Sequence, residues 1–232
     1  MARKPAKKLA ARKQASLAEL KAKAGRVIEI LSREYPEAHC ALDYETPAQL
    51  LFATILSAQC TDVMVNKVTR ILFPRYPDVR SLAEAKLSDV EAIVRPTGFY
   101  KNKAKNLIAC AQKLVREHGG EVPKGMEELV VLPGVGRKTA NVVRGNAFGI
   151  PGMVVDTHVK RLTNLLGLTR EEDPVKIEAE MMAIVPEADW TMFSHWLISH
   201  GRALCVARRP RCGDCPARLV CDFGQKEGLP ER

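Results

Sequence analysis

The spacing of apolar residues between prolines is the feature that most restricts the fold of this chain. The sequence has 14 prolines, and most segments between them place apolar residues three or four positions apart, as one face of an α-helix requires. Residues 17–35 show this spacing, and long helices are expected at 101–118, ended by a Gly-Gly pair, and at 189–200, ended by Gly201. Strand-like alternation is almost absent, so the sequence predicts an all-α fold of about ten helices.

The composition is that of a globular chain without a membrane span. Of its 232 residues, 46% are hydrophobic, which is enough to build a sizeable core. The apolar runs are short and none approaches the roughly 20 residues that a membrane helix needs. No apolar segment follows the basic N-terminus, so we expect no secretory signal.

The positive charge of the chain is concentrated at its N-terminus. Residues 1–18 carry six of the net nine positive charges and no acidic residue, which leaves +3 for the remainder. A basic arm of this kind adds salt-dependent affinity for phosphates, and a solubilising or targeting extension is the alternative. The basic residues are Arg3, Lys4, Lys7, Lys8, Arg12 and Lys13.

A glycine-rich hairpin lies between the helical segments 126–131 and 137–148. Its sequence is Leu-Pro-Gly-Val-Gly, at residues 132–136. Glycine lets an anion approach the backbone, and the following helix directs unpaired N–H groups and its positive dipole end at the same space. This pattern predicts a helix-hairpin-helix that binds DNA phosphates through Gly134, Val135, Gly136 and Arg137. An ordinary turn between two helices also favours these residues.

Lys138 and Asp156 are the candidate chemical groups. Lys138 falls on the first turn of the helix after the hairpin, where a cation is disfavoured by about 0.3–1 kcal/mol. Such a site suits a neutral amine nucleophile, although a lysine that binds phosphate is equally natural there. Asp156 stands where a carboxylate would cap the helix at 159–166, and near an amine it would also manage protons or stabilise a cationic sugar. His158 is adjacent, and a structural role is the simpler interpretation for it.

Four of the seven cysteines form a second constellation. They follow the pattern C-x6-C-x2-C-x5-C within 17 residues, in a chain without secretory context, which predicts a metal site. Only one short knuckle is present, so unequal loops slightly favour an iron–sulfur cluster over zinc. The ligands would be Cys205, Cys212, Cys215 and Cys221, and the loop between the first two would present Arg208, Arg209 and Arg211 to phosphates.

Taken together, these motifs resemble a known family. The segments LPGVGRKTANVV and VDTHVKR, followed by the cysteine pattern, resemble endonuclease III, a bifunctional DNA glycosylase and AP lyase of base-excision repair. The upstream segment at residues 56–62, LSAQCTD, shares the resemblance. The similarity extends from about residue 20 to about residue 225.

The resemblance implies a two-domain fold with a DNA groove between the domains. Residues 40–150 would form a six-helix, barrel-like domain that contains the hairpin. Residues 19–39 and 151–232 would form a helical domain that holds a [4Fe–4S] cluster, and residues 1–18 would be a disordered basic tail. We expect a monomer that acts in a bacterial cytoplasm at the nucleoid, or in a nucleus or mitochondrion if the host is a eukaryote.

The resemblance also implies the chemistry. Lys138 matches the Schiff-base lysine and Asp156 the catalytic aspartate. Gln59 and Phe99 match loop positions that fill the gap left by the extruded nucleotide, and Ser57, Asp62 and His158 would line the pocket. The substrate would be double-stranded DNA with oxidised pyrimidines or abasic sites, cleaved by β-elimination.

The sequence departs from the family at Phe99, where an aliphatic residue is usual, and at Cys60, where alanine is more common.

Two other functions are alternatives to a bifunctional glycosylase. An adenine-type monofunctional glycosylase shares the hairpin and the cysteines, but it usually lacks the lysine and carries a further C-terminal domain. In a non-catalytic, metal-stapled DNA-binding protein, Lys138 would bind phosphate and Asp156 would only cap a helix.

Overall fold

The computed structural model describes residues 15–226, and helices joined by turns and loops make up that range. It contains twelve α-helices and four short 3-10 helices, with no strand between residues 15 and 226, so the all-α prediction is confirmed. The α-helices are α1 (Leu17–Glu34), α2 (Pro47–Leu56), α3 (Asp62–Arg75), α4 (Val79–Ala83), α5 (Leu87–Val94), α6 (Tyr100–His118), α7 (Met126–Val130), α8 (Arg137–Ala147), α9 (Thr157–Leu166), α10 (Pro174–Ile184), α11 (Trp190–Ala203) and α12 (Asp222–Lys226). The 3-10 helices are η1 (Arg95–Thr97), η2 (Glu187–Asp189), η3 (Cys212–Asp214) and η4 (Arg218–Val220).

Local side-chain chemistry sets many of the helix ends. Ser16 and Glu19 form a reciprocal capping box at the start of α1, in which the Ser16 N–H donates to Glu19 Oε2 over 2.7 Å. Thr61 caps α3, and Asp173 caps α10 ahead of a proline at the first helical position. The predicted glycine stop after residue 118 is confirmed, because Gly119 ends α6 in the left-handed conformation.

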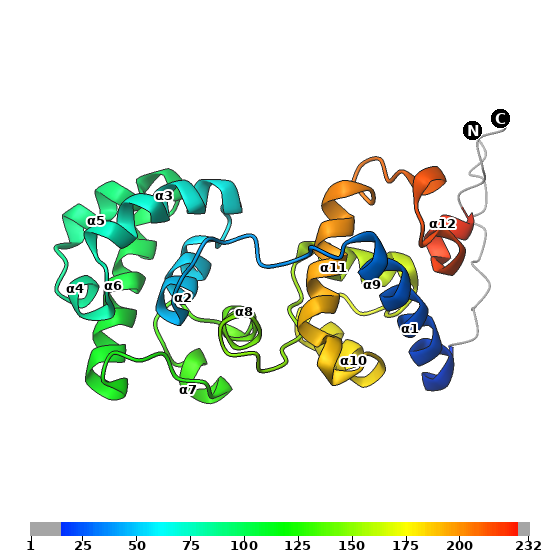
Figure 1. The fold of residues 1–232 in the computed structure, drawn as a ribbon, viewed down its shortest axis with the longest axis horizontal. Coiled ribbons are helices and arrows are strands. Elements are labelled where there is room, and N and C mark those ends of the chain that lie inside the picture. The colour runs from blue at the N-terminus through cyan, green and yellow to red at the C-terminus, as the bar shows by residue number, and fades with distance from the viewer. Residues whose placement is uncertain (1–14, 227–232) are drawn as a thin grey trace, which may run out of the picture.

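Two separate hydrophobic cores organise these helices. One core is built from α2 to α8, and the other joins α1 to α9, α10, α11 and η4. Figure 1 shows the two groups side by side, with the blue N-terminal helix α1 lying among the yellow and orange C-terminal helices. The chain therefore crosses from one core to the other after α1 and returns after α8. Our division into domains at 39/40 and 150/151 stays a proposal.

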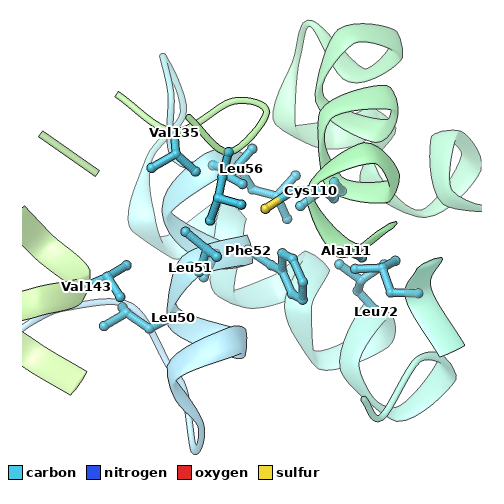
Figure 2. Close-up of a cluster of buried hydrophobic side chains, with 14 of the residues drawn as sticks. Leu50, Leu51, Phe52, Leu56, Leu72, Cys110, Ala111, Val135 and Val143 are labelled. Carbon is cyan, nitrogen blue, oxygen red and sulfur yellow. The ribbon is translucent and has the colours of Figure 1, made fainter. Parts of the chain in front are cut away.

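Helix α2 is the centre of the first core. Every residue from 50 to 56 is buried, so this helix has no polar face and is surrounded on all sides. Figure 2 shows Leu51, Phe52 and Leu56 from α2 packed with Leu72 and Cys110 from neighbouring helices. This burial explains the continuous apolar run in the sequence.

Helix α11 differs from its predicted length. We expected Gly201 to end it, but the helix continues through Gly201 to Ala203. The glycine is needed for space, because a Cβ placed there would lie 2.6 Å from His158 Nδ1. The tail prediction also changes at its end, because α1 already begins at Leu17. Residues 1–14 lie outside the described part of the chain.

Within residues 15–226, no helix is both long enough and apolar enough to cross a membrane.

Candidate active site

The hairpin between α7 and α8 is anchored to the first core through its valine. Val135 is buried in that core, and its N–H donates to Leu132 O over 3.1 Å. Gly134 has a φ of +77°, and a Cβ there would lie 3.0 Å from the Asn106 Cβ. Glycine is therefore required at position 134 by both conformation and space.

Gly136 has a different reason to be glycine. It is the N-cap of α8 with an ordinary φ of −98°. Apart from its two chain neighbours, no described residue has an atom within 4 Å of a Cβ built on it. No side chain in that part of the chain caps this helix end. The fold alone does not demand glycine here, so the open N–H groups at the start of α8 are accessible to an anion.

Lys138 is the second residue of α8 and is exposed, as the position of the predicted nucleophile requires. Its neighbour Arg137 is engaged elsewhere. The Arg137 Nε donates to both carboxylate oxygens of Glu178, each over 3.0 Å, and one terminal nitrogen lies 2.8 Å from Oε1. This hydrogen bonding raises the pKa of the Arg137 guanidinium. Glu178 lies on α10 and was not found from the sequence.

Asp156 is the N-cap of α9. Its Oδ1 accepts a hydrogen bond from the Val159 N–H over 2.8 Å, so the predicted capping role is confirmed. The preceding segment is buried, and the Val154 N–H donates to Ser194 Oγ over 2.9 Å. This places Asp156 at a half-buried position, at the end of an irregular segment that the hydrogen bond to Ser194 holds in place. A chemical role for its carboxylate stays a prediction.

The other predicted pocket residues lie at helix ends. Asp62 is the first residue of α3, and its carboxylate accepts from Arg202 over 2.6 Å. Ser57 ends α2 and donates to Thr54 O over 2.8 Å. Burial lowers the pKa of His158, opposed by the Asp156 carboxylate. The buried His158 Nδ1 has no hydrogen-bond partner among residues 15–226.

Gln59 and Phe99 share an unusual backbone conformation. Within residues 15–226 they are the two non-glycine residues with positive φ, at 53° and 47°. Such a conformation costs roughly 1–3 kcal/mol and persists where the surroundings impose it, often at a functional site. Phe99 is also 67% exposed, which is rare for so large an apolar side chain.

Lys103 secures the Phe99 loop and was missed by the sequence analysis. It is 5% exposed, and its Nζ donates to Thr97 O over 2.7 Å, just before the loop turns at Gly98. Burial lowers the pKa of Lys103. Its position among the apolar residues of α6, beside Ala104 and Leu107, is the one signal in the sequence that marked it as unusual.

The four clustered cysteines come together in space. All four line one cavity of about 20 Å³, enclosed mainly by apolar side chains such as Leu162 and Leu166. Between residues 15 and 226, no group of three or more Cys, His, Asp or Glu side chains is placed so that it could hold a single metal ion. The four cysteines thus line the cavity together. They are Cys205, Cys212, Cys215 and Cys221.

Polar neighbours reach two of these sulfurs from other helices. Arg161 of α9 lies 3.5 Å from Cys205 Sγ, and His200 Nε2 lies 3.4 Å from Cys215 Sγ. The other His200 nitrogen lies 3.0 Å from the Tyr35 hydroxyl. Burial raises the pKa of Cys215 to about 11. A metal or cluster that binds this sulfur as a thiolate therefore has to displace the thiol proton.

The arginines of the loop between the first two cysteines are all exposed. Arg211 donates to Ala203 O over 2.6 Å and so closes the loop onto the end of α11. Arg208 and Arg209 extend from the same loop. Their contact with phosphates stays a prediction.

Comparisons with known proteins agree on one family. Residues 52–187 match the model of the HhH-GPD superfamily of base excision DNA repair proteins. The chain is 53% identical over 210 residues to endonuclease III of Synechocystis sp., covering 90% of this chain and 96% of that protein. It is 44% identical over 202 residues to endonuclease III of Bacillus subtilis, covering 85% and 92%.

Solved structures give the same result. A non-covalent endonuclease III–DNA complex is 40% identical with a TM-score of 0.85, covering 89% of this chain and 97% of that chain. A trapped endonuclease III–DNA covalent intermediate is 39% identical with a TM-score of 0.84, covering 91% and 98%. A thermostable thymine-DNA glycosylase, 21% identical with a TM-score of 0.79 and covering 88% and 98%, shares the fold.

The two hairpin glycines should respond differently to alanine. Gly134→Ala should lower the free energy of unfolding by about 1–2 kcal/mol, because alanine is strained at positive φ and would press on Asn106. Gly136→Ala should change it by less than about 0.5 kcal/mol, because a weaker N-cap is offset by lower entropy of the unfolded chain. Urea denaturation measures both free energies of unfolding. Equal losses in the two variants would contradict the conclusion that the fold leaves room for a Cβ at Gly136.

Proposed function

The chain belongs to the endonuclease III family within the HhH-GPD superfamily, and on that premise we propose that it is a DNA glycosylase with AP lyase activity in base-excision repair. Its substrate is double-stranded DNA that contains oxidised pyrimidines or abasic sites. The observation that carries the proposal is the likeness, over 91% of this chain, to an endonuclease III trapped in covalent linkage to DNA. Lys138 on the exposed first turn of α8 is the amine suited to form such a linkage.

Access to the reacting carbon requires the damaged nucleotide to leave the helix. Flipping costs a few kcal/mol, and less where damage weakens stacking or pairing. Gln59 and Phe99 offset that cost by entering the vacated space. Their strained backbones and the exposure of Phe99 support this role, because a strained loop presents a side chain that the fold itself does not need.

The Lys138 amine then attacks C1′ of the flipped nucleotide. A nitrogen–carbon bond forms as the glycosidic bond breaks, and the base departs with a proton that water supplies. The proton that the amine releases passes through the Asp156 carboxylate to the ring oxygen when the ring opens. The sugar ring opens and leaves a protonated imine that acidifies the C2′ proton. Loss of that proton expels the 3′ phosphate oxygen, and hydrolysis of the imine restores the lysine. The Asp156 carboxylate takes the proton that the amine releases and stabilises positive charge on the sugar.

Phosphate binding holds the duplex in place during these steps. The open N–H groups at the start of α8 and the glycines of the hairpin bind the backbone without reading base sequence. Arg208 and Arg209 add cationic contacts from the cysteine loop. Ser57, Asp62 and His158 lie at helix ends that we assign to the lesion pocket.

The four cysteines fit a [4Fe–4S] cluster. They line one cavity in a mainly apolar shell, and four cysteines within 17 residues supply the thiolate ligands that such a cluster takes. We propose that Cys205, Cys212, Cys215 and Cys221 hold this cluster. When bound, it supplies a structural staple for residues 205–221. We also propose that the protein acts as a monomer, in the two domains divided at 39/40 and 150/151.

Lys138 is tested by borohydride trapping on a duplex that contains thymine glycol. The wild-type protein should give a covalent protein–DNA adduct, because borohydride reduces the imine to a stable amine. Lys138→Gln should give none, because an amide nitrogen does not form an imine. Denaturing gel electrophoresis measures the adduct.

The matched control is Lys67→Gln, which removes one positive charge from an exposed position on α3. It should trap at the wild-type rate. If the wild type bound the duplex tightly but gave no adduct, Lys138 would be a phosphate ligand and the protein a monofunctional glycosylase or a DNA-binding protein.

Asp156→Asn separates capping from chemistry. Asparagine caps a helix as well as aspartate does, so the free energy of unfolding should change by less than about 0.5 kcal/mol. The single-turnover rate of lesion cleavage should fall at least about 100-fold, because the carboxylate that manages the proton is lost. Unchanged cleavage would leave Asp156 with a capping role alone.

Phe99→Ala tests the wedge. The affinity for a thymine-glycol duplex should fall by about 1–3 kcal/mol, the range for one lost stacking contact. Stability should hardly change, because the side chain is 67% exposed. Ile71→Ala is the control, since Ile71 is 60% exposed on α3. A loss of affinity of the same size in both variants would contradict a specific role for Phe99.

A further inference from the structure

The two residues to which we assign the chemistry pack into different cores. Lys138 is carried by α8, whose Ala140 and Val143 belong to the first core. Asp156 is carried by the start of α9, whose Val159 belongs to the second core. Neither core by itself fixes the distance between the amine and the carboxylate. Some contact between the cores has to do so.

We propose that Arg137, Asn141 and Glu178 form a positioning cluster that sets Lys138 relative to Asp156. The inference rests on the proposed function. Within this cluster, Arg137 orients the first turn of α8 and is not primarily a phosphate ligand.

The carboxylate of Glu178 is the centre of this cluster. Its side chain is 8% exposed, on a helix whose buried residues Ile177 and Met181 belong to the second core. It accepts from Arg137 Nε at both oxygens over 3.0 Å, and from Asn141 Nδ2 over 3.1 Å. A bidentate pair of this kind fixes the plane of the guanidinium and therefore the backbone that carries it.

Asn141 extends the cluster to the segment before Asp156. It lies one turn after Arg137 on the same face of α8 and is 2% exposed. The same Nδ2 that donates to Glu178 also donates to Met153 O over 2.9 Å. Gly152 lets this segment approach, because a Cβ there would lie 3.0 Å from Asn141 O. The cluster thus holds the neighbour of Lys138 and a backbone group three residues before Asp156.

Stability alone is a weak reason to keep a buried carboxylate. A buried ion pair seldom stabilises more than apolar residues of the same volume, because both charges lose their hydration. Positional control is a stronger reason, since a displacement of about 1 Å of a reacting group slows a reaction by about 100-fold. Through Glu178 and Asn141 the cluster joins α8, α10 and the backbone at Met153, where such control is most effective.

The test combines Glu178→Gln, Arg137→Ala and the double variant. The single-turnover rate of adduct formation is measured on an abasic-site duplex with borohydride. The dissociation constant is measured at several salt concentrations on a duplex with a tetrahydrofuran abasic analogue. Each single variant should slow adduct formation about 10- to 100-fold, and the double variant should be no slower than the slower single one, because the residues act as a unit. Affinity should change less than about threefold, with an unchanged salt slope.

Two further variants separate position from stability. Glu178→Asp keeps the charge but withdraws the carboxylate by one methylene, so it should also slow adduct formation in folded protein. Val27→Ala destabilises the second core from α1, a helix that contributes no residue to the cluster, and it should trap at the wild-type rate per folded molecule. Melting curves give the folded fraction of every variant.

The inference is overturned if Glu178→Gln traps at the wild-type rate while Arg137→Ala weakens binding and lowers the salt slope by about 1, as loss of a phosphate contact would. It is also overturned if every slow variant is slow only in proportion to its unfolded fraction. Absence of an adduct from the wild type would instead refute the proposed function.

Discussion

The contact between the two hydrophobic cores is the constraint on which the rest of this structure depends. The chain passes between the cores after α1 and again after α8, so elements of the site reach it from both sides. Polar side chains make several of the crossing contacts. Asp62 accepts from Arg202 over 2.6 Å, and Asn146 Oδ1 lies 2.7 Å from His195 Nε2. Together with Glu178, these contacts use directional hydrogen bonds where apolar packing alone would permit sliding.

The two loops that we propose to contact DNA have strained backbones, and the first core restrains them. Gln59 and Phe99 hold left-handed backbones that each cost roughly 1–3 kcal/mol. The first core supplies the restraint. Lys103 Nζ binds Thr97 O from below the Phe99 loop, and the Lys103 N–H donates to Phe99 O over 3.1 Å. Because the buried Lys103 holds the turn in place, the phenyl ring of Phe99 stays exposed and does not pack into the core.

Features that depend on neighbours in the sequence were predictable. The hairpin before α8 and the Asp156 cap of α9 follow from local pattern, and the structure has them as expected. Features set by distant contacts were not. Gly201 reads as a helix stop, yet it lies inside α11. It is glycine because His158, far earlier in the chain, occupies the space that its Cβ would need. Glu178 and Lys103 likewise gain their meaning only from partners on other elements, which no local pattern encodes.

Helix α9 shows how the cysteine loop bears on the site from a distance. At its start, Asp156 caps the helix. At its end, Cys221 Sγ contacts Leu165 O over 3.3 Å, and the Lys23–Asp222 ion pair, 2.6 Å long, packs against Gly167. Midway, Arg161 reaches Cys205 Sγ. The loop of residues 205–221 therefore contacts α9, the helix that Asp156 caps. Because α9 is only ten residues long, restraint at its far end limits tilting at its start. The position of Asp156 therefore depends on the cysteine loop, because the loop restrains α9.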